Sequence, residues 1–196
     1  VLWFTVAFLQ LNPEILEQVE PGCPAFPEQD KMERLQQCGV GALLHDIGKA
    51  FVPQEILTKH DPLTEIEWEI MKRHPLTGLA MLVDTDIPLF VKKAVLHHHE
   101  DFYGGGYPCS IAGAGITVLG RVLRIVDVFD AITSRRPYKD PMAPMAAAMI
   151  MIGTPEGSEH GEEPIQDGRD LGMLRCFDNE LLRKFIVFLG NVKLSG

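Results

Sequence analysis

The sequence predicts an all-α fold. Apolar residues recur three and four positions apart in several stretches, whereas strict alternation of apolar and polar residues over the length of a strand is hard to find. The longest periodic stretch, residues 116–134, places one apolar set on a single side of a helix: Leu119, Val122, Leu123, Val126 and Phe129. Both observations favour packed helices over a sheet.

The 196 residues have the length of one domain, and 46% of them are hydrophobic, enough to bury a core. Residues 1–11 are expected to be a first helix truncated at its N-terminus, because the apolar run begins at Val1 rather than at a methionine. Residues 12–30 hold several prolines and are predicted to be a connector. The predicted core, residues 31–152, contains helices over 31–44, 64–74, 76–83, 90–99, 116–134 and 142–152.

One helix of the core has a clear start and stop. Thr64 and Glu67 have the spacing of a capping box, so we expect a helix to begin there and to run to His74, before Pro75. The last helix of the core is rich in Ala and Met, and three methionines are expected to fill the core: Met142, Met145 and Met149.

Two loops are predicted from glycine and acidic composition. Residues 104–108 contain three glycines followed by Tyr107 and Pro108, a run that cannot continue a helix. Residues 153–175 are rich in Gly, Pro and Glu and predict an inserted acidic loop, since this composition buries too little apolar surface to order itself. A terminal amphipathic helix is expected over residues 177–190.

The composition argues against two classes of protein. A formal net charge of -9 argues against binding to nucleic acid, because contacts with phosphates need a basic surface. The apolar run at the start is shorter than the ~20 residues that span a bilayer. The four cysteines lie far apart and form no CxxC pair, which fits a reducing compartment, and we therefore expect a cytoplasmic protein.

Histidines and aspartates carry the chemical signal. Five of the seven histidines lie in one stretch, at predicted helix ends or beside the glycine loop: His45, His74, His97, His98 and His99. Asp127 lies within an apolar stripe, where a carboxylate is costly unless it is paired or binds a cation. Imidazole and carboxylate groups together are ligands for Zn, Mn, Fe or Ni. If these groups converge in space, they predict a metal hydrolase.

Six short motifs follow one another along the chain: His45-Asp46-Ile47-Gly48-Lys49, Lys72-Arg73-His74-Pro75, His98-His99-Glu100, Gly104-Gly105-Gly106-Tyr107-Pro108, Asp127-Val128-Phe129-Asp130-Ala131 and Ser134-Arg135-Arg136-Pro137-Tyr138-Lys139. In this order and spacing the sequence resembles the HD-GYP family, bacterial cyclic di-GMP phosphodiesterases of the HD metal-hydrolase superfamily. The resemblance is close over residues 41–138 and looser elsewhere. It implies a multi-helix HD-superfamily bundle around a metal centre.

The resemblance also implies a centre of two or three divalent ions, with iron or manganese expected first and nickel or zinc as alternatives. Its ligands would be four histidines and two aspartates: His45, Asp46, His74, His98, His99 and Asp127. Asp46 would bridge two ions, with the histidines at positions 74, 98 and 99 on the second ion and Asp127 on the first. His97 is expected to be either exposed or a support for these ligands.

Further residues would, by the same resemblance, act on the substrate. Asp46 and Lys49 would be catalytic, with Lys49 near a nonbridging oxygen or the leaving group. Arg136 and Lys139 would bind phosphates or guanine edges, although the same pair also fits a solvated basic face. Tyr107 would either contact the substrate at the pocket wall or pack within its loop.

The partners implied by the resemblance are the substrate, cyclic di-GMP, and a diguanylate cyclase domain docked on the Gly104–Pro108 loop. The products would be pGpG and then GMP. An upstream sensor or receiver domain and a homodimer are further expectations.

No histidine precedes His45, although the family carries a ligand in its first helix. Either that ligand lies before Val1 or it has been lost. Two alternatives to a cyclic di-GMP phosphodiesterase therefore stay open. One is an HD phosphohydrolase that acts on another nucleotide, and the other is a catalytically weak domain that senses cyclic dinucleotides or docks proteins.

Overall fold

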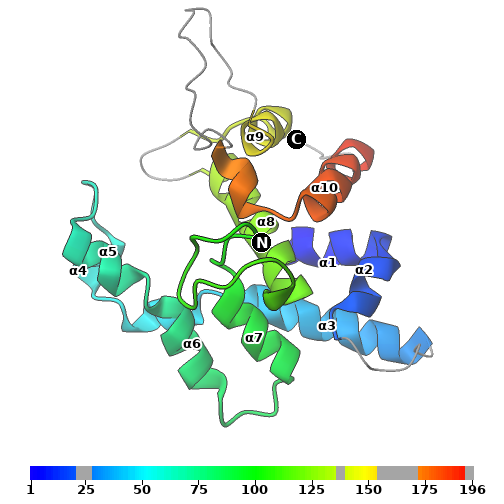
Figure 1. Ribbon diagram of the computed structural model, residues 1–196, viewed down its shortest axis with the longest axis horizontal. Helices are drawn as coiled ribbons and strands as arrows, with labels where there is room; N and C mark the ends of the chain where they lie inside the picture. Colours follow the sequence, from blue (N-terminus) through cyan, green and yellow to red (C-terminus); the bar gives the residue numbers. More distant parts are fainter. Residues whose placement is uncertain (21–27, 136–139, 154–171, 193–196) are drawn as a thin grey trace, which may run out of the picture.

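The computed structural model describes residues 1–20, 28–135, 140–153 and 172–192. These residues form ten α-helices and three short 3-10 helices, and none of them forms a strand, which confirms the all-α prediction (Figure 1). Within these ranges no helix is both long and apolar enough to cross a membrane. The elements are α1 (Leu2–Leu11), α2 (Pro13–Gln18), α3 (Glu28–Leu44), η1 (Ile47–Phe51), α4 (Gln54–Leu57), α5 (Glu65–Met71), α6 (His74–Leu82), α7 (Leu89–His97), η2 (Gly113–Gly115), α8 (Val118–Thr133), α9 (Pro144–Met151), η3 (Gly172–Cys176) and α10 (Asn179–Asn191).

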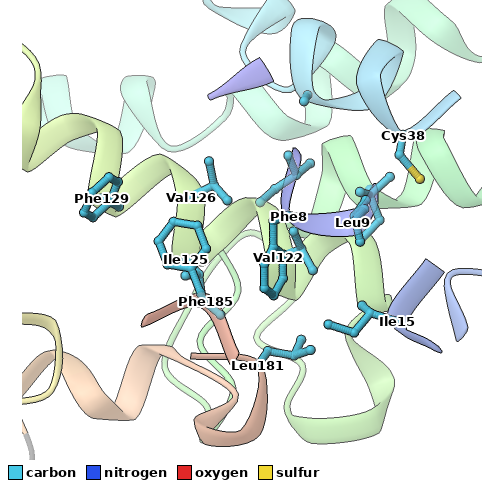
Figure 2. Close-up of a cluster of buried hydrophobic side chains, with 14 of the residues drawn as sticks. Phe8, Leu9, Ile15, Cys38, Val122, Ile125, Val126, Phe129, Leu181 and Phe185 are labelled. Carbon is cyan, nitrogen blue, oxygen red and sulfur yellow. The ribbon is translucent and has the colours of Figure 1, made fainter. Parts of the chain in front are cut away.

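Helix α8 is the centre of the fold. It begins after Thr117, whose hydroxyl accepts a hydrogen bond from the backbone N–H of Gly120. The five residues predicted for its apolar side are all fully buried, so that prediction is confirmed: Leu119, Val122, Leu123, Val126 and Phe129. Helices α1, α7, α9 and α10 pack around α8. Figure 2 shows side chains of α1 and α10 meeting it.

Phenylalanine rings join α1, α8 and α10. Phe8 contacts Phe185 and Phe188 edge to face, with ring centroids 5.5 and 5.6 Å apart, and Phe129 contacts Phe185 at 5.3 Å. Such pairs add roughly 0.5–1.5 kcal/mol each beyond the area that they bury. The terminal helix therefore belongs to the core, and it starts after Asp178, whose side chain accepts hydrogen bonds from the first-turn N–H groups.

Several helix boundaries differ from those expected, and three of these differences matter for the fold. The connector over residues 12–30 contains helix α2, because Pro13 occupies the first turn, where its missing N–H is not needed. His74 begins α6 rather than ending the helix before it, since Pro75 is tolerated in a first turn in the same way. Helix α7 ends at His97, two residues earlier than expected.

Helix α9 turns a different side to the core than expected. Met145 and Met149 are exposed, whereas Met151 is buried and Met142 is half-buried. The prediction is thus wrong for the two exposed methionines, because the buried side of α9 consists of Ala147, Ala148 and Met151. The acidic loop expected over residues 153–175 lies largely outside the described residues.

The ends of several helices meet at one place. Helix α6 packs against η1 and α7, and α7 packs against α3 and α8. The contact between η1 and α6 is close because Gly48 has no side chain: a Cβ there would collide with the carbonyl oxygen of His74. This packing brings the start of α6 beside the end of α3 and the end of α7.

Candidate metal centre

Three histidines at these helix ends share one arrangement. In His45, His74 and His98, Nδ1 lies 2.8, 2.8 and 2.7 Å from the backbone carbonyl oxygen three residues earlier. A carbonyl oxygen can only accept, so Nδ1 carries the proton and donates it. When such an imidazole is neutral, its lone pair therefore lies on Nε2, the nitrogen that is free to bind a metal.

The Nε2 atoms converge on the carboxylate of Asp46. His74 Nε2 lies 3.2 Å and His98 Nε2 lies 3.8 Å from Asp46 Oδ1, and His45 Nε2 lies 3.3 Å from Asp46 Oδ2. The Nε2 atoms of His74 and His98 are 3.1 Å apart. Asp46 thus presents one oxygen to His45 and the other to the remaining pair.

The possible ligand atoms form two groups that share Asp46. The first group consists of residues whose ligand atoms all lie within 4.8 Å of one another: Asp46, His74, His98 and His99. The second adds Asp127 of α8, whose Oδ1 lies 3.7 Å from His45 Nε2. The neighbours His98 and His99 both reach the first group because α7 has already ended, so helical rotation no longer separates their side chains.

His99 is held differently from the other three histidines. Its Nδ1 lies 3.4 Å from Nη1 of Arg124, a donor, and Arg124 also donates to Asp101 Oδ1 at 2.7 Å. One face of the His99 ring stacks on Tyr107, with centroids 4.8 Å apart and planes inclined by 26°. His99 therefore connects the cluster to the loop that carries Tyr107.

The carboxylates of the cluster are ionised. Burial would raise the pKa of Asp46, but the imidazoles around it hold that pKa far below its usual range. Burial likewise opposes ionisation of Asp127, and contact with His45 lowers its pKa. Burial would lower the pKa of His45, but Asp127 and Asp46 outweigh this effect and raise it to about 9. The carboxylates of Asp46 and Asp127 attract a proton to His45 Nε2. The same two negative charges would also attract a metal ion to this position.

The residues of this cluster fit divalent metal ions. His45 Nε2 and Asp46 Oδ1 are buried without a hydrogen-bond partner among the described residues. Lone pairs of imidazole and carboxylate point at one another across 3.1–3.8 Å, and such acceptors repel unless a cation lies among them. Imidazole nitrogen with carboxylate oxygen is a ligand set for first-row divalent metals.

The other predicted site residues are placed as follows. Lys49 Nζ lies 2.7 Å from Asp46 Oδ2, at the rim of the cluster. Tyr107 is half-buried against His99, which agrees with packing of its loop and also leaves it beside the cluster. Arg136 and Lys139 lie outside the described residues.

Two features of the surroundings were not predicted. Glu100 is 1% exposed, and its carboxylate accepts hydrogen bonds from the backbone N–H groups of Cys109 and Ile111, at 2.6 and 3.1 Å. The Asp101–Arg124 ion pair joins α8 to the turn after α7. The only sequence signal for Glu100 is its position directly after the histidine pair.

His97 is buried and accepts a hydrogen bond from the N–H of Thr117, away from the cluster.

A family model described as "HD domain" matches residues 18–156. Among curated proteins, the chain is 45% identical over 106 residues to "Cyclic di-GMP phosphodiesterase PA4108" of Pseudomonas aeruginosa, which covers 54% of this chain and 26% of that protein. It is 36% identical over 170 residues to a "Cyclic di-GMP phosphodiesterase" of Vibrio cholerae, covering 82% of this chain and 34% of the relative. The chain thus spans about a quarter to a third of the length of these relatives.

Among solved structures, the chain is similar to Bd1817, a HDG"Y"P protein from Bdellovibrio bacteriovorus. The TM-score is 0.59, with 17% sequence identity, and the match covers 95% of this chain and 51% of the other. At this identity the likeness concerns the fold, and it agrees with the all-helical architecture described above.

Proposed function

Because the chain belongs to the HD domain family, we propose that it is a metal-dependent phosphodiesterase that hydrolyses cyclic di-GMP to pGpG and onward to GMP. The observation that carries the proposal is the convergence of His45, His74 and His98 on Asp46, each with Nδ1 fixed by a backbone carbonyl. Its relatives named cyclic di-GMP phosphodiesterases support the choice of substrate.

In this proposal Asp46 would be a ligand shared by two metal ions, because its two oxygens face different histidines. His45 and Asp127 would hold one ion, and the remaining histidines would hold the other: His74, His98 and His99. Divalent cations at such a site lower the pKa of water and neutralise charge on phosphoryl oxygens. We place iron or manganese ahead of nickel or zinc on the family resemblance alone, because imidazole and carboxylate ligands suit all four metals.

Lys49 would act on the phosphodiester itself. Its ammonium lies 2.7 Å from Asp46 Oδ2, and 38% of its side chain is exposed, so it can reach a phosphoryl oxygen at the rim of the cluster. Asp46 orients this ammonium, and the positive charge would stabilise negative charge that develops on the substrate. Arg136 and Lys139 would bind the phosphates or guanine edges, and Tyr107 would line the pocket wall. Support for Arg136 and Lys139 comes from the sequence resemblance alone.

The test is hydrolysis of cyclic di-GMP by the purified chain, followed by chromatography of pGpG and GMP. Asp46→Asn should abolish turnover, with a loss above about 1,000-fold, and should reduce bound metal, whereas the exposed control Asp84→Asn should change neither. Activity of Asp46→Asn within twofold of the unmodified chain would contradict the proposal. Arg136→Ala should raise the KM for cyclic di-GMP by a larger factor than the factor by which it lowers the metal content.

The same assay separates the two alternatives. A higher kcat/KM for another cyclic dinucleotide, such as 3′,3′-cyclic GMP-AMP, would indicate an HD phosphohydrolase with a different substrate. Tight binding of metal and of cyclic di-GMP without hydrolysis would indicate a sensor.

We also propose the Gly104–Pro108 loop as a docking surface for a diguanylate cyclase domain in the cytoplasm. Its support is the family resemblance, and the adjacent Tyr103, 53% of which is accessible, offers a residue for the test. Loss of binding to a purified cyclase domain in Tyr103→Ala, without loss of turnover, would be the expected result.

A further inference from the structure

A pocket of about 580 Å³ opens beside the metal-binding cluster and shares His99 with it. Two aromatic side chains, Trp68 of α5 and Tyr107 of the glycine loop, contribute to its wall. Three cationic side chains also line it: Lys72, Arg73 and Arg124. Pockets of this size are typical of small-ligand sites, and this pocket joins aromatic surface to positive charge.

The aromatic side chains form a continuous path outward from the cluster. Tyr107 stacks on His99, and Trp68 meets Tyr107 edge to face with centroids 6.2 Å apart. Trp68 is the outermost ring, and 45% of it is exposed. A partly exposed indole next to the proposed phosphodiesterase centre can serve as a stacking platform for a nucleobase.

The charges of the pocket differ in how far they are already neutralised. Lys72 pairs with Glu69 at 2.5 Å, and Arg124 pairs with Asp101 at 2.7 Å. Arg73 is exposed and, within the described parts of the chain, makes no ion pair. A free guanidinium at the mouth of an aromatic pocket suits a phosphate, which it can bind through two parallel N–H groups.

We propose that this pocket binds the nucleotide half of the substrate that lies away from the scissile phosphate, with its purine base stacked on Trp68 and its phosphate held by Arg73. The assignment rests on the proposed function, because it takes the cluster as the place of hydrolysis. It adds two substrate-binding residues on α5 and at the start of α6. Trp68 and Arg73 act in binding and take no part in metal retention.

Binding can be measured without turnover. In a Trp3→Phe variant, Trp68 is the single tryptophan of the chain, so its emission reports on the pocket. GMP, which contains base and phosphate but no diester, should quench this emission saturably, and ribose 5-phosphate should not. Arg73→Ala should weaken the binding of GMP about tenfold and leave the binding of guanosine, which has no phosphate, unchanged. Equal responses to GMP and ribose 5-phosphate, or no response to either, would overturn the assignment.

Turnover supplies the second readout. Trp68→Ala should raise KM for cyclic di-GMP by about 5- to 100-fold, the range of base stacking on an aromatic ring, with unchanged metal content. The Trp68→Ala variant should hydrolyse methyl p-nitrophenyl phosphate, a diester without a base, at a rate within twofold of that of the unmodified chain. Trp68→Phe should restore most of the affinity, and Trp3→Ala is the matched control on another exposed indole, 55% accessible.

These outcomes separate the two proposals. If the unmodified chain binds GMP at Trp68 but hydrolyses no cyclic dinucleotide, the function fails and the pocket assignment stands. If cyclic di-GMP is hydrolysed and Trp68→Ala leaves its KM unchanged, the function stands and the pocket assignment fails.

Discussion

His74 Nε2 and His98 Nε2 lie 3.1 Å apart, although each ring has committed its Nδ1 proton to a carbonyl on its own segment. Two imidazole lone pairs at this distance repel one another unless a cation lies between or beside them. The segments that carry them, the start of α6 and the end of α7, are packed together, so the rings cannot separate freely. The fold therefore holds a set of acceptors that a metal ion would stabilise.

Removal of metal should accordingly lower the stability of the chain. A ligand present at 100 times its Kd adds about 2.7 kcal/mol, which corresponds to roughly 5–10 °C in Tm for a domain of this size. We expect calorimetry to show a drop of this order after chelation and a recovery on return of manganese or iron. An unchanged Tm, with metal shown by mass spectrometry to have left, would contradict this expectation.

His98→Ala should lose metal where His97→Ala retains it. The two residues are neighbours and both are buried, but only His98 reaches Asp46, whereas His97 accepts a hydrogen bond from the N–H of Thr117. Metal content per chain, measured on both purified variants, is the readout. Equal loss in the two variants would mean that general destabilisation, rather than ligation, controls retention.

Gly48→Ala should destabilise the chain and disturb the cluster together. A Cβ at position 48 would collide with the carbonyl oxygen of His74 and approach the backbone nitrogen of Gly78 to 2.5 Å. Because backbone cannot move aside as a side chain can, we expect a cost of at least ~1–3 kcal/mol and displacement of His74. Chemical unfolding and metal content measure the two effects.

Gly190→Ala is the matched control for this substitution. It lies in α10 with nothing within 4 Å of the added Cβ, and alanine there should stabilise the helix by about 0.5–1 kcal/mol. Equal stability of the two variants would show that η1 and α6 are not in close contact.

Glu100→Gln should loosen the segment that follows the glycine loop. The carboxylate accepts from the N–H groups of Cys109 and Ile111 with different oxygens, so an amide must turn its NH₂ toward one of these donors. A buried donor left unpaired costs about 1–3 kcal/mol. The measurements are unfolding free energy and protease cleavage near position 109, with the exposed Glu180→Gln as control. Unchanged cleavage and stability would show that the hydrogen bonds that Glu100 accepts from Cys109 and Ile111 do not hold this segment in place.

The identities of the cluster residues were predictable, but their geometry was not. The family resemblance named these residues, and Asp127 also carries a local signal, because a carboxylate within an apolar stripe is costly unless it is paired or binds a cation. The approach of His74 to Asp46 depends on the close contact of η1 and α6 at Gly48, a tertiary contact that hydrophobic periodicity does not display.

The boundary errors have a similar cause. Pro75 is equally compatible with the end of one helix and with the first turn of the next, so sequence alone could not place His74 at the start of α6. The Asp101–Arg124 pair was missed because it joins two segments that meet only after α7 packs on α8. The α8 core was predictable because its periodicity is long and strong.

The contacts of Glu67 with Lys59 and within the capping box of α5 should make stability fall at acid pH. Glu67 accepts hydrogen bonds from Lys59 and from the N–H of Thr64, and these contacts lower its pKa from the ordinary 4.5 to about 2. A carboxyl whose folded pKa is depressed stabilises the folded chain above its unfolded pKa, and that contribution is lost as the pH falls from 4.5 toward 2. Glu67→Gln should therefore flatten the dependence of Tm on pH within this window, while the exposed control Glu65→Gln should leave it unchanged. Parallel Tm curves for the unmodified chain and Glu67→Gln would show that neither the Lys59–Glu67 ion pair nor the capping box stabilises the chain in solution.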